Sequence, residues 1–142
     1  MHEYAISIAG GPAAPVHATS SPRPELVVGP PPDFDGSDAW WSPEQLLLVS
    51  LAGCFDNTFR ALAARAGVPI FSMSCRARGS LGKTSVGLSF TGIHLAVDIE
   101  VGSADAAKTH ALLADAERKC IVRNSLHAPV LIESIVTIAA VA

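Results

Sequence analysis

The chain has 142 residues, a formal net charge of −3 and 49% hydrophobic residues. This length suits one domain, and the apolar fraction is large enough to build a core without disulfide or metal staples. A slightly acidic chain without a basic block is a poor candidate for nucleic-acid binding.

The first 41 residues are predicted to form an arm of short strands and loops. Tyr4–Ile8 alternates apolar and small polar residues as a strand does, and Glu25–Val28 indicates a second short strand. Residues 10–24 are rich in Gly, Pro, Ala and Ser, and residues 29–36 contain three consecutive prolines. Both segments are typical of loops, because proline removes backbone hydrogen-bond donors.

A long central helix is predicted over residues 42–67. Ser42 is a typical N-cap, Gln45 completes a capping box, and Gly67 favours a stop. The segment Leu46–Phe55 is apolar nearly all round the helix, which predicts that this helix is buried rather than lying on the surface.

The rest of the chain, residues 68–142, is predicted to form strands and one further helix capped by Ser103. This order of elements predicts an α+β fold with a mostly antiparallel sheet, in a single domain over residues 1–142. The expected elements are strands at 70–78, 86–90 and 94–101, the helix at 104–119, and a last strand at 130–141.

Several kinds of site are disfavoured. Ala77–Thr84 matches a relaxed phosphate-loop pattern, but a strand rather than a helix is expected to follow it, so we interpret it as a hairpin turn. The five histidines and three cysteines lack metal-ligand spacing, so no metal site is expected. The apolar runs are shorter than the ~20 residues of a membrane span, and the N-terminus lacks a basic signal-peptide region. We therefore expect a cytoplasmic protein with no membrane partner.

Two cysteines, Cys54 and Cys120, lie far apart in the sequence on apolar segments that both favour helix. Such a pair can meet in a fold and cycle between dithiol and disulfide, which reduces a peroxide without a metal or an organic cofactor. A thiol reacts only as its thiolate, so Cys54 needs a cation or strong donors nearby. Arg118, Lys119 and Arg123 flank Cys120. The alternative is that both thiols are ordinary packed core residues.

Other residues have weaker signals. Cys75 lies in a strand-like segment and is interpreted as structural. Arg23 is the only Arg or Lys in the first 59 residues, so a cation supplied to Cys54 by the arm must be Arg23 or a protonated His17. Glu44 precedes Cys54 by ten residues, a rise of ~15 Å on one helix, so it can reach Cys54 only through an arginine or across a subunit interface. A solvated Arg23, and a Glu44 that only favours the helix dipole, are the alternatives.

The segment Ser42–Phe55 resembles the long-helix motif of the OsmC/Ohr family of peroxide-reducing proteins, including the spacing from Glu44 to Cys54. Ala116–Cys120, followed by Asn124–Leu126, resembles the second cysteine motif of that family. The resemblance covers residues 20 to 138. It implies an intertwined homodimer in which a sheet wraps each long central helix.

The resemblance also implies roles for individual residues. Cys54 would be the peroxidatic thiol, forming a sulfenic acid, and Cys120 the resolving thiol, forming a disulfide with it. A dithiol such as a lipoyl group would reduce that disulfide. The family supports its thiolate with an N-terminal arginine held by the motif glutamate, which points to Arg23 and Glu44. The family's second motif usually has proline directly after the cysteine, where this chain has Ile121.

The sequence thus predicts a thiol-dependent hydroperoxide reductase. Leu51, Phe55 and Phe59, on the apolar flank of Cys54, would bind substrate and favour an organic hydroperoxide over hydrogen peroxide. Two other hypotheses remain open at this stage. One is a non-catalytic dimer that binds an apolar small molecule, and the other is a thiol redox sensor.

Overall fold

A computed structural model describes residues 1–140. The chain forms two compact units, Met1–Leu47 and Leu48–Ala142, and the division between them falls inside helix α1 (Pro43–Arg65). The single domain over residues 1–142 therefore stays a prediction. Part of the predicted last strand, residue 141, lies outside the described residues.

The first unit is built on a three-stranded antiparallel sheet of order β1-β2-β3. Its strands are β1 (Ser7–Ala9), β2 (Val16–Thr19) and β3 (Leu26–Val28), and a 3-10 turn follows at Pro32–Phe34. The two predicted strands are present with shifted bounds. The prediction of loop over residues 10–24 is wrong at β2, whose four residues owe their strand conformation to pairing on both sides rather than to their own alternation.

The signals at the ends of α1 act as predicted. The Gln45 N–H donates to Ser42 Oγ at 3.1 Å, and the Ser42 N–H donates to Gln45 Oε1 at 3.1 Å, which is a capping box. After the helix, Gly67 adopts a φ of 69°, a conformation that glycine accepts without strain. Local sequence therefore determines both ends of this helix.

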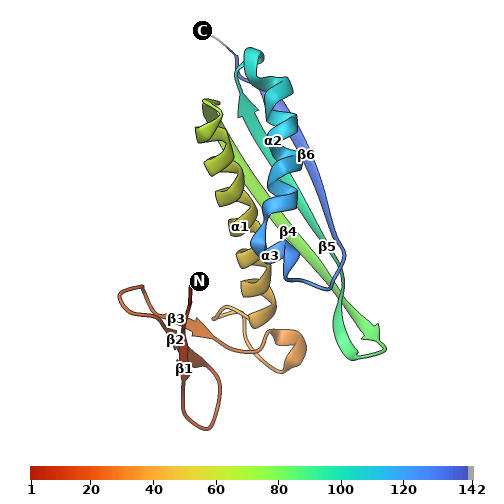
Figure 1. Ribbon diagram of the computed structural model, residues 1–142. Coiled ribbons are helices and arrows are strands. Elements are labelled where there is room, and N and C mark those ends of the chain that lie inside the picture. Colours follow the sequence, from red (N-terminus) through yellow and green to blue (C-terminus); the bar gives the residue numbers. More distant parts are fainter. Residues whose placement is uncertain (141–142) are drawn as a thin grey trace. The chain divides into compact units, whose positions relative to one another are not determined.

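The second unit contains a sheet of order β4-β5-β6 (Figure 1). β4 (Ile70–Thr84) and β5 (Gly87–Val101) form a long antiparallel hairpin, and β6 (Val130–Ile138) pairs with β5 in parallel. The hairpin turn predicted at Ala77–Thr84 is wrong, since these residues belong to β4. Gly79, which suggested a turn, instead makes room for a neighbouring side chain: a Cβ there would lie 2.5 Å from the Phe90 ring.

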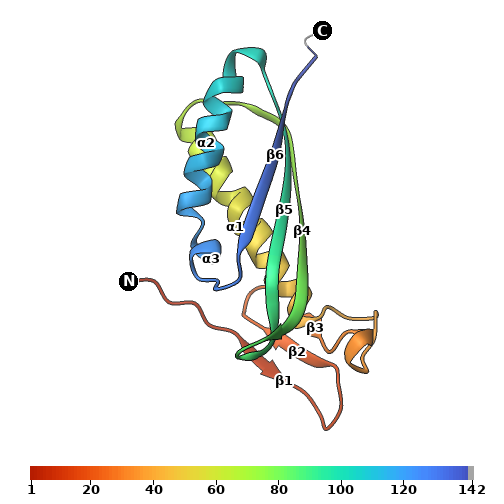
Figure 2. The same cartoon turned by 90° about the vertical axis from the view of Figure 1, so that its right-hand side faces the viewer.

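Helix α2 (Ala106–Lys119) begins after a 3-10 turn at Ser103–Asp105, and a short helix α3 (Ile121–Asn124) follows it. The predicted second helix is thus confirmed in position, although no side-chain cap from Ser103 is present and the α-helix starts later than expected. Helix α3 was not predicted. Figures 1 and 2 show α1 and α2 on the same face of the β4-β5-β6 sheet.

The core of this second unit lies between α1 and the sheet. Between Leu51 and Ala63 every fourth side chain of α1 is fully buried. Between Ile93 and Val101 every second side chain of β5 is buried, as the alternating pattern predicted. The buried residues on these two elements are Leu51, Phe55, Phe59 and Ala63 on α1, and Ile93, Leu95, Val97, Ile99 and Val101 on β5.

Within this single chain, α1 is buried along one side. Val49, for example, is 50% exposed, because only one side of the helix packs on the sheet. By length and composition alone α1 could cross a membrane, with a mean hydropathy of 1.3. That criterion is also met by the core helix of a folded domain, and the buried stripe of α1 against β5 is the packing of such a helix.

Candidate active site

The structure brings Cys54 and Cys120 into contact. Cys54 lies in the middle of α1, and Cys120 lies at the break between α2 and α3, where its φ of −68° and ψ of 108° take it out of helical geometry. The Cys120 thiol donates a hydrogen bond to the Cys54 sulfur. All three cysteines are unpaired thiols in this structure.

The break after Cys120 also supplies backbone donors to Cys54. Because α3 starts at Ile121, its first N–H groups have no helical carbonyl to bond. Hydrogen bonding by the N–H groups of Val122 and Ile121 instead lowers the pKa of Cys54. Thr58 lies one turn after Cys54 on α1, and its hydroxyl donates to the Cys54 carbonyl oxygen at 2.7 Å and also lies within hydrogen-bond reach of the sulfur.

These contacts determine which thiol ionises first. Burial opposes the charge on Cys54, but the Val122 N–H, the Cys120 thiol, the Ile121 N–H and the Thr58 hydroxyl together lower the pKa of Cys54 below its ordinary value. The causes are hydrogen bonds and not a cation, which is the second of the two possibilities that the sequence left open. Hydrogen-bond donors therefore take the place of a charge here.

Cys120 has the opposite character. Burial raises the pKa of Cys120, the Arg123 N–H partly offsets that, and the hydrogen bond given to Cys54 raises it again. Its side chain is 0% exposed. The pair therefore consists of one thiol that ionises easily and one that stays protonated.

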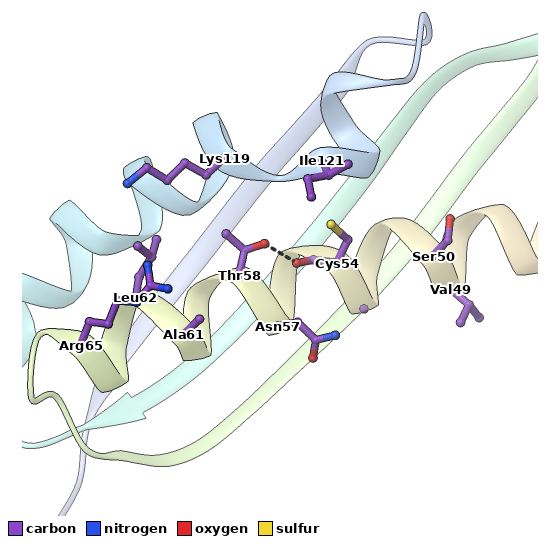
Figure 3. Close-up of a pocket in the computed structure, with 11 residues that line it drawn as sticks. Val49, Ser50, Cys54, Asn57, Thr58, Ala61, Leu62, Arg65, Lys119 and Ile121 are labelled. Carbon is purple, nitrogen blue, oxygen red and sulfur yellow. Dashed lines mark hydrogen bonds between the residues drawn. The ribbon is translucent and has the colours of Figure 1, made fainter. Parts of the chain in front are cut away.

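Cys54 lines a pocket of about 650 Å³ in the second unit, whereas Cys120 does not (Figure 3). The pocket runs along one side of α1, and Lys119 and Ile121 line it from α2 and α3. Figure 3 shows the Cys54 sulfur pointing toward Ile121, with Arg65 and Lys119 at the far end of the pocket. The Nζ of Lys119 bonds Asp115 at 2.8 Å.

The three predicted substrate-binding side chains do not line this pocket. Leu51, Phe55 and Phe59 are each 0% exposed and face the sheet. They follow one another at four-residue intervals, whereas Cys54 lies about 100° round the helix from Phe55. The apolar residues that do line the pocket include Val49, Leu62 and Ile121.

Glu44 and Arg23 belong to the first unit. Glu44 lines a separate, largely apolar pocket of about 610 Å³, and its Oε2 atom is buried without a hydrogen-bond partner among residues 1–140. Arg23 is exposed, and its Nη1 donates to Ser20 Oγ at 3.5 Å. The Nδ1 atom of His17 lies within hydrogen-bond distance of Glu25 Oε1, at 2.7 Å. The roles predicted for Glu44 and Arg23 stay predictions.

Cys75 lies on β4. Burial, followed by the nearby Asp56 carboxylate, raises the pKa of Cys75 to about 11. It is thus a protonated, partly buried thiol at neutral pH. Within residues 1–140, His, Cys, Asp and Glu side chains do not gather into a group that could hold a metal ion.

Sequence reasoning missed two parts of this site. The first is Thr58, which the four-residue spacing from Cys54 could have revealed. The second is the pair of backbone N–H groups after Cys120. They are available because the helix breaks at Cys120, and the residues around Ile121 do not predict such a break. Both parts contribute to lowering the pKa of Cys54.

The family match and the similar solved structures both point to OsmC-like proteins. The OsmC-like protein family matches residues 36–134. Among solved structures, the chain is similar to an OsmC-like protein of unknown function from Vibrio cholerae, with 19% identity, a TM-score of 0.87, and coverage of 95% of this chain and 100% of that one. No curated protein sequence matches the chain significantly.

Two further structural neighbours are named for a role in hydroperoxide resistance. An organic hydroperoxide resistance protein from Elizabethkingia anophelis has 19% identity and a TM-score of 0.75, covering 97% of this chain and 99% of that one. An organic hydroperoxide resistance protein OsmC from Legionella pneumophila has 23% identity and a TM-score of 0.72, covering 96% and 99%. At these identities the likeness shows the α+β fold and nothing finer.

Proposed function

This chain belongs to the OsmC-like protein family, and from that premise we propose that it reduces organic hydroperoxides with the thiol pair of Cys54 and Cys120. The observation that carries the proposal is the asymmetry of the pair. One thiol has a lowered pKa and lines a pocket, and the other is buried, protonated and bonded to it. A peroxidatic and a resolving thiol need these two characters.

The two thiols, the peroxide and an external dithiol are sufficient for a complete catalytic cycle. The Cys54 thiolate attacks one peroxide oxygen, the O–O bond breaks, and the alkoxide leaves and takes a proton, giving an alcohol and a Cys54 sulfenic acid. The Cys120 thiol then attacks the Cys54 sulfur and expels water, which leaves a disulfide. An external dithiol, such as a lipoyl group, reduces the disulfide and is itself oxidised to a cyclic disulfide.

The external dithiol has to attack the disulfide at the Cys54 sulfur. Thiol–disulfide exchange needs an accessible sulfur, and Cys54 lines the pocket while Cys120 is 0% exposed. Attack at Cys54 also releases Cys120 as the leaving thiol. A reducing compartment such as the cytoplasm would supply the dithiol.

The pocket favours an apolar hydroperoxide. Its wall near Cys54 contains Val49, Ala61, Leu62 and Ile121. These residues, rather than the buried Leu51 stripe, would contact the organic part of the substrate. Burying that part in the pocket contributes binding that hydrogen peroxide cannot obtain.

We also propose that the protein works as a homodimer, as the family resemblance implies. Val49 and Ile121, both at the pocket, are 50% and 73% exposed. Large apolar side chains that are exposed together commonly mark a surface that a partner covers.

Steady-state consumption of cumene hydroperoxide with dihydrolipoate tests the proposed function. Cys54→Ser should abolish turnover. Cys120→Ser should consume one equivalent of hydroperoxide without forming an intramolecular disulfide. Cys75→Ser, the matched control that removes the third thiol, should keep turnover close to that of the unmodified protein. Full activity of Cys54→Ser would rule out the mechanism.

A further inference from the structure

The break between α2 and α3 has no proline to enforce it. Proline is the residue that most readily starts a helix at its first position, because its ring presets φ and it lacks the N–H. Ile121 occupies that position here and is compatible with helix. The backbone alone would therefore allow α2 to continue through Cys120 into α3.

A continuous helix would remove the donors from the thiols. In such a helix the Val122 N–H would bond the Arg118 carbonyl four residues earlier, and the Ile121 N–H would bond the Glu117 carbonyl. In the structure the ψ of 108° at Cys120 breaks the helix, and hydrogen bonding by both N–H groups lowers the pKa of Cys54 instead. Whatever holds the break open also controls the environment of Cys54.

A side chain occupies the place that a helical N–H would take. The Asn124 Nδ2 donates to the Arg118 carbonyl oxygen at 2.9 Å, and this is the acceptor that a continuous helix would offer to Val122. The backbone N–H of Asn124 meanwhile bonds the Cys120 carbonyl at 3.0 Å, within the new helical turn. Asn124 thus supplies a hydrogen-bond donor to a free carbonyl group at the end of α2, while its own backbone is part of α3.

An ion pair spans the same break. The Arg123 Nη2 donates to Glu117 Oε1 at 3.1 Å, which joins the last full turn of α2 to α3. The two side chains are 33% and 39% exposed. The Nε of Arg123 is buried without a hydrogen-bond partner among the described residues, so the guanidinium lies where Glu117 holds it rather than where water would solvate it best.

We propose that Asn124 and the Glu117–Arg123 ion pair are positioning groups that hold α2 and α3 apart and so keep the first N–H groups of α3 on the thiol pair. A proline directly after the cysteine would favour the same helix break through its backbone conformation, whereas here side chains stabilise it. The inference deepens the proposed function, but it concerns thiol reactivity and can be tested without peroxide.

The test is the pH profile of Cys54 alkylation by iodoacetamide, resolved by peptide mass spectrometry. Arg123→Gln and Asn124→Ala should each move the midpoint of the profile upward by about 0.5–1 pH unit, the equivalent of about one hydrogen bond. Alkylation at high pH, where the thiol is fully ionised, should remain unchanged.

Two further variants make the test specific. Arg118→Gln is the matched control: it removes an arginine of the same segment whose partner is Asp115 within α2, so it should leave the midpoint unchanged. Ile121→Pro fixes the break through the backbone, although it removes the Ile121 N–H, so in this background Arg123→Gln should no longer shift the midpoint. Cys120 already has the extended conformation that a following proline requires.

Three results would overturn the proposal. They are unchanged midpoints for Arg123→Gln and Asn124→Ala, an equal shift for Arg118→Gln, and a shift for Arg123→Gln that is just as large when Ile121→Pro is already present. Slow alkylation of Cys75 at neutral pH in every variant verifies that the sheet is folded. If the shifts are found in a protein that does not consume hydroperoxide, this inference stands and the proposed function fails.

Discussion

The Cys120 thiol donates a hydrogen bond to the sulfur of Cys54. Two thiols that are far apart in the sequence, one on α1 and one between α2 and α3, therefore influence each other's ionisation. Cys54 alone of the two lines the pocket. This arrangement fixes the order of events in the proposed reaction, because the thiol that meets the substrate is also the one that ionises more easily.

The order of modification of the thiols follows from this asymmetry. At pH 7.5, limiting iodoacetamide should label Cys54 first, since its pKa is lowered and it lines a pocket, whereas burial raises the pKa of both Cys120 and Cys75. Site-resolved mass spectrometry measures the three rates. Labelling of Cys120 ahead of Cys54 would contradict the assignment of roles.

The Thr58 hydroxyl should help to lower the pKa of Cys54. Thr58→Val removes the donor and keeps the shape, so the midpoint of Cys54 alkylation should rise by about 0.7 pH unit, the equivalent of ~1 kcal/mol. Thr58→Ser keeps a hydroxyl and should stay close to the unmodified protein. Equal profiles for Val and Ser at this position would show that the hydroxyl serves only the Cys54 carbonyl.

Phe59 separates a core role from a substrate-binding role. Because it is fully buried, Phe59→Ala should lower the free energy of unfolding by about 3–5 kcal/mol. Phe71 is 64% exposed, and Phe71→Ala should cost less than about 1 kcal/mol. Urea denaturation measures both. A Phe59→Ala protein of unchanged stability but raised KM for hydroperoxide would restore the substrate-binding prediction.

Cys75 should make stability depend on alkaline pH. The folded state raises the pKa of Cys75 to about 11, while an unfolded chain ionises a thiol near pH ~8.5. The folded state therefore favours the neutral thiol, and this contribution is complete below pH ~8.5 and is lost as pH rises toward 11.

Urea midpoints from pH 7 to 10 measure the effect. The unmodified protein should lose stability above pH ~8.5 more steeply than Cys75→Ala, in which the other two thiols are retained. Parallel curves for the two proteins would mean that the Cys75 thiol ionises equally well in the folded and unfolded chains.

Local signals in the sequence predicted α1 well. Ser42, Gln45 and Gly67 determine the ends of the helix through bonds and conformations that involve only their neighbours. The α+β class and the alternating burial of β5 follow from hydrophobic patterning for the same reason. The family resemblance was then confirmed by a match over residues 36–134.

Features that depend on distant partners could not be predicted in this way. Gly79 indicated a turn, but its lack of a side chain serves the Phe90 ring on the opposite strand. The alignment of the Val122 N–H with Cys54 depends on a break that Asn124 and Arg123 hold through side chains. The donor set at Cys54 is therefore a tertiary property, and a search for a nearby cation could not find it.

The most direct test of the central claim is intact mass and free-thiol count after one equivalent of cumene hydroperoxide, on the unmodified protein and on Cys120→Ser. We expect the unmodified protein to lose two thiols and the mass of two hydrogen atoms, with Cys54 and Cys120 joined in one peptide. Cys120→Ser should instead carry a dimedone-reactive sulfenic acid on Cys54. Unchanged thiols in both proteins would show that the pair is structural and contradict the proposed function.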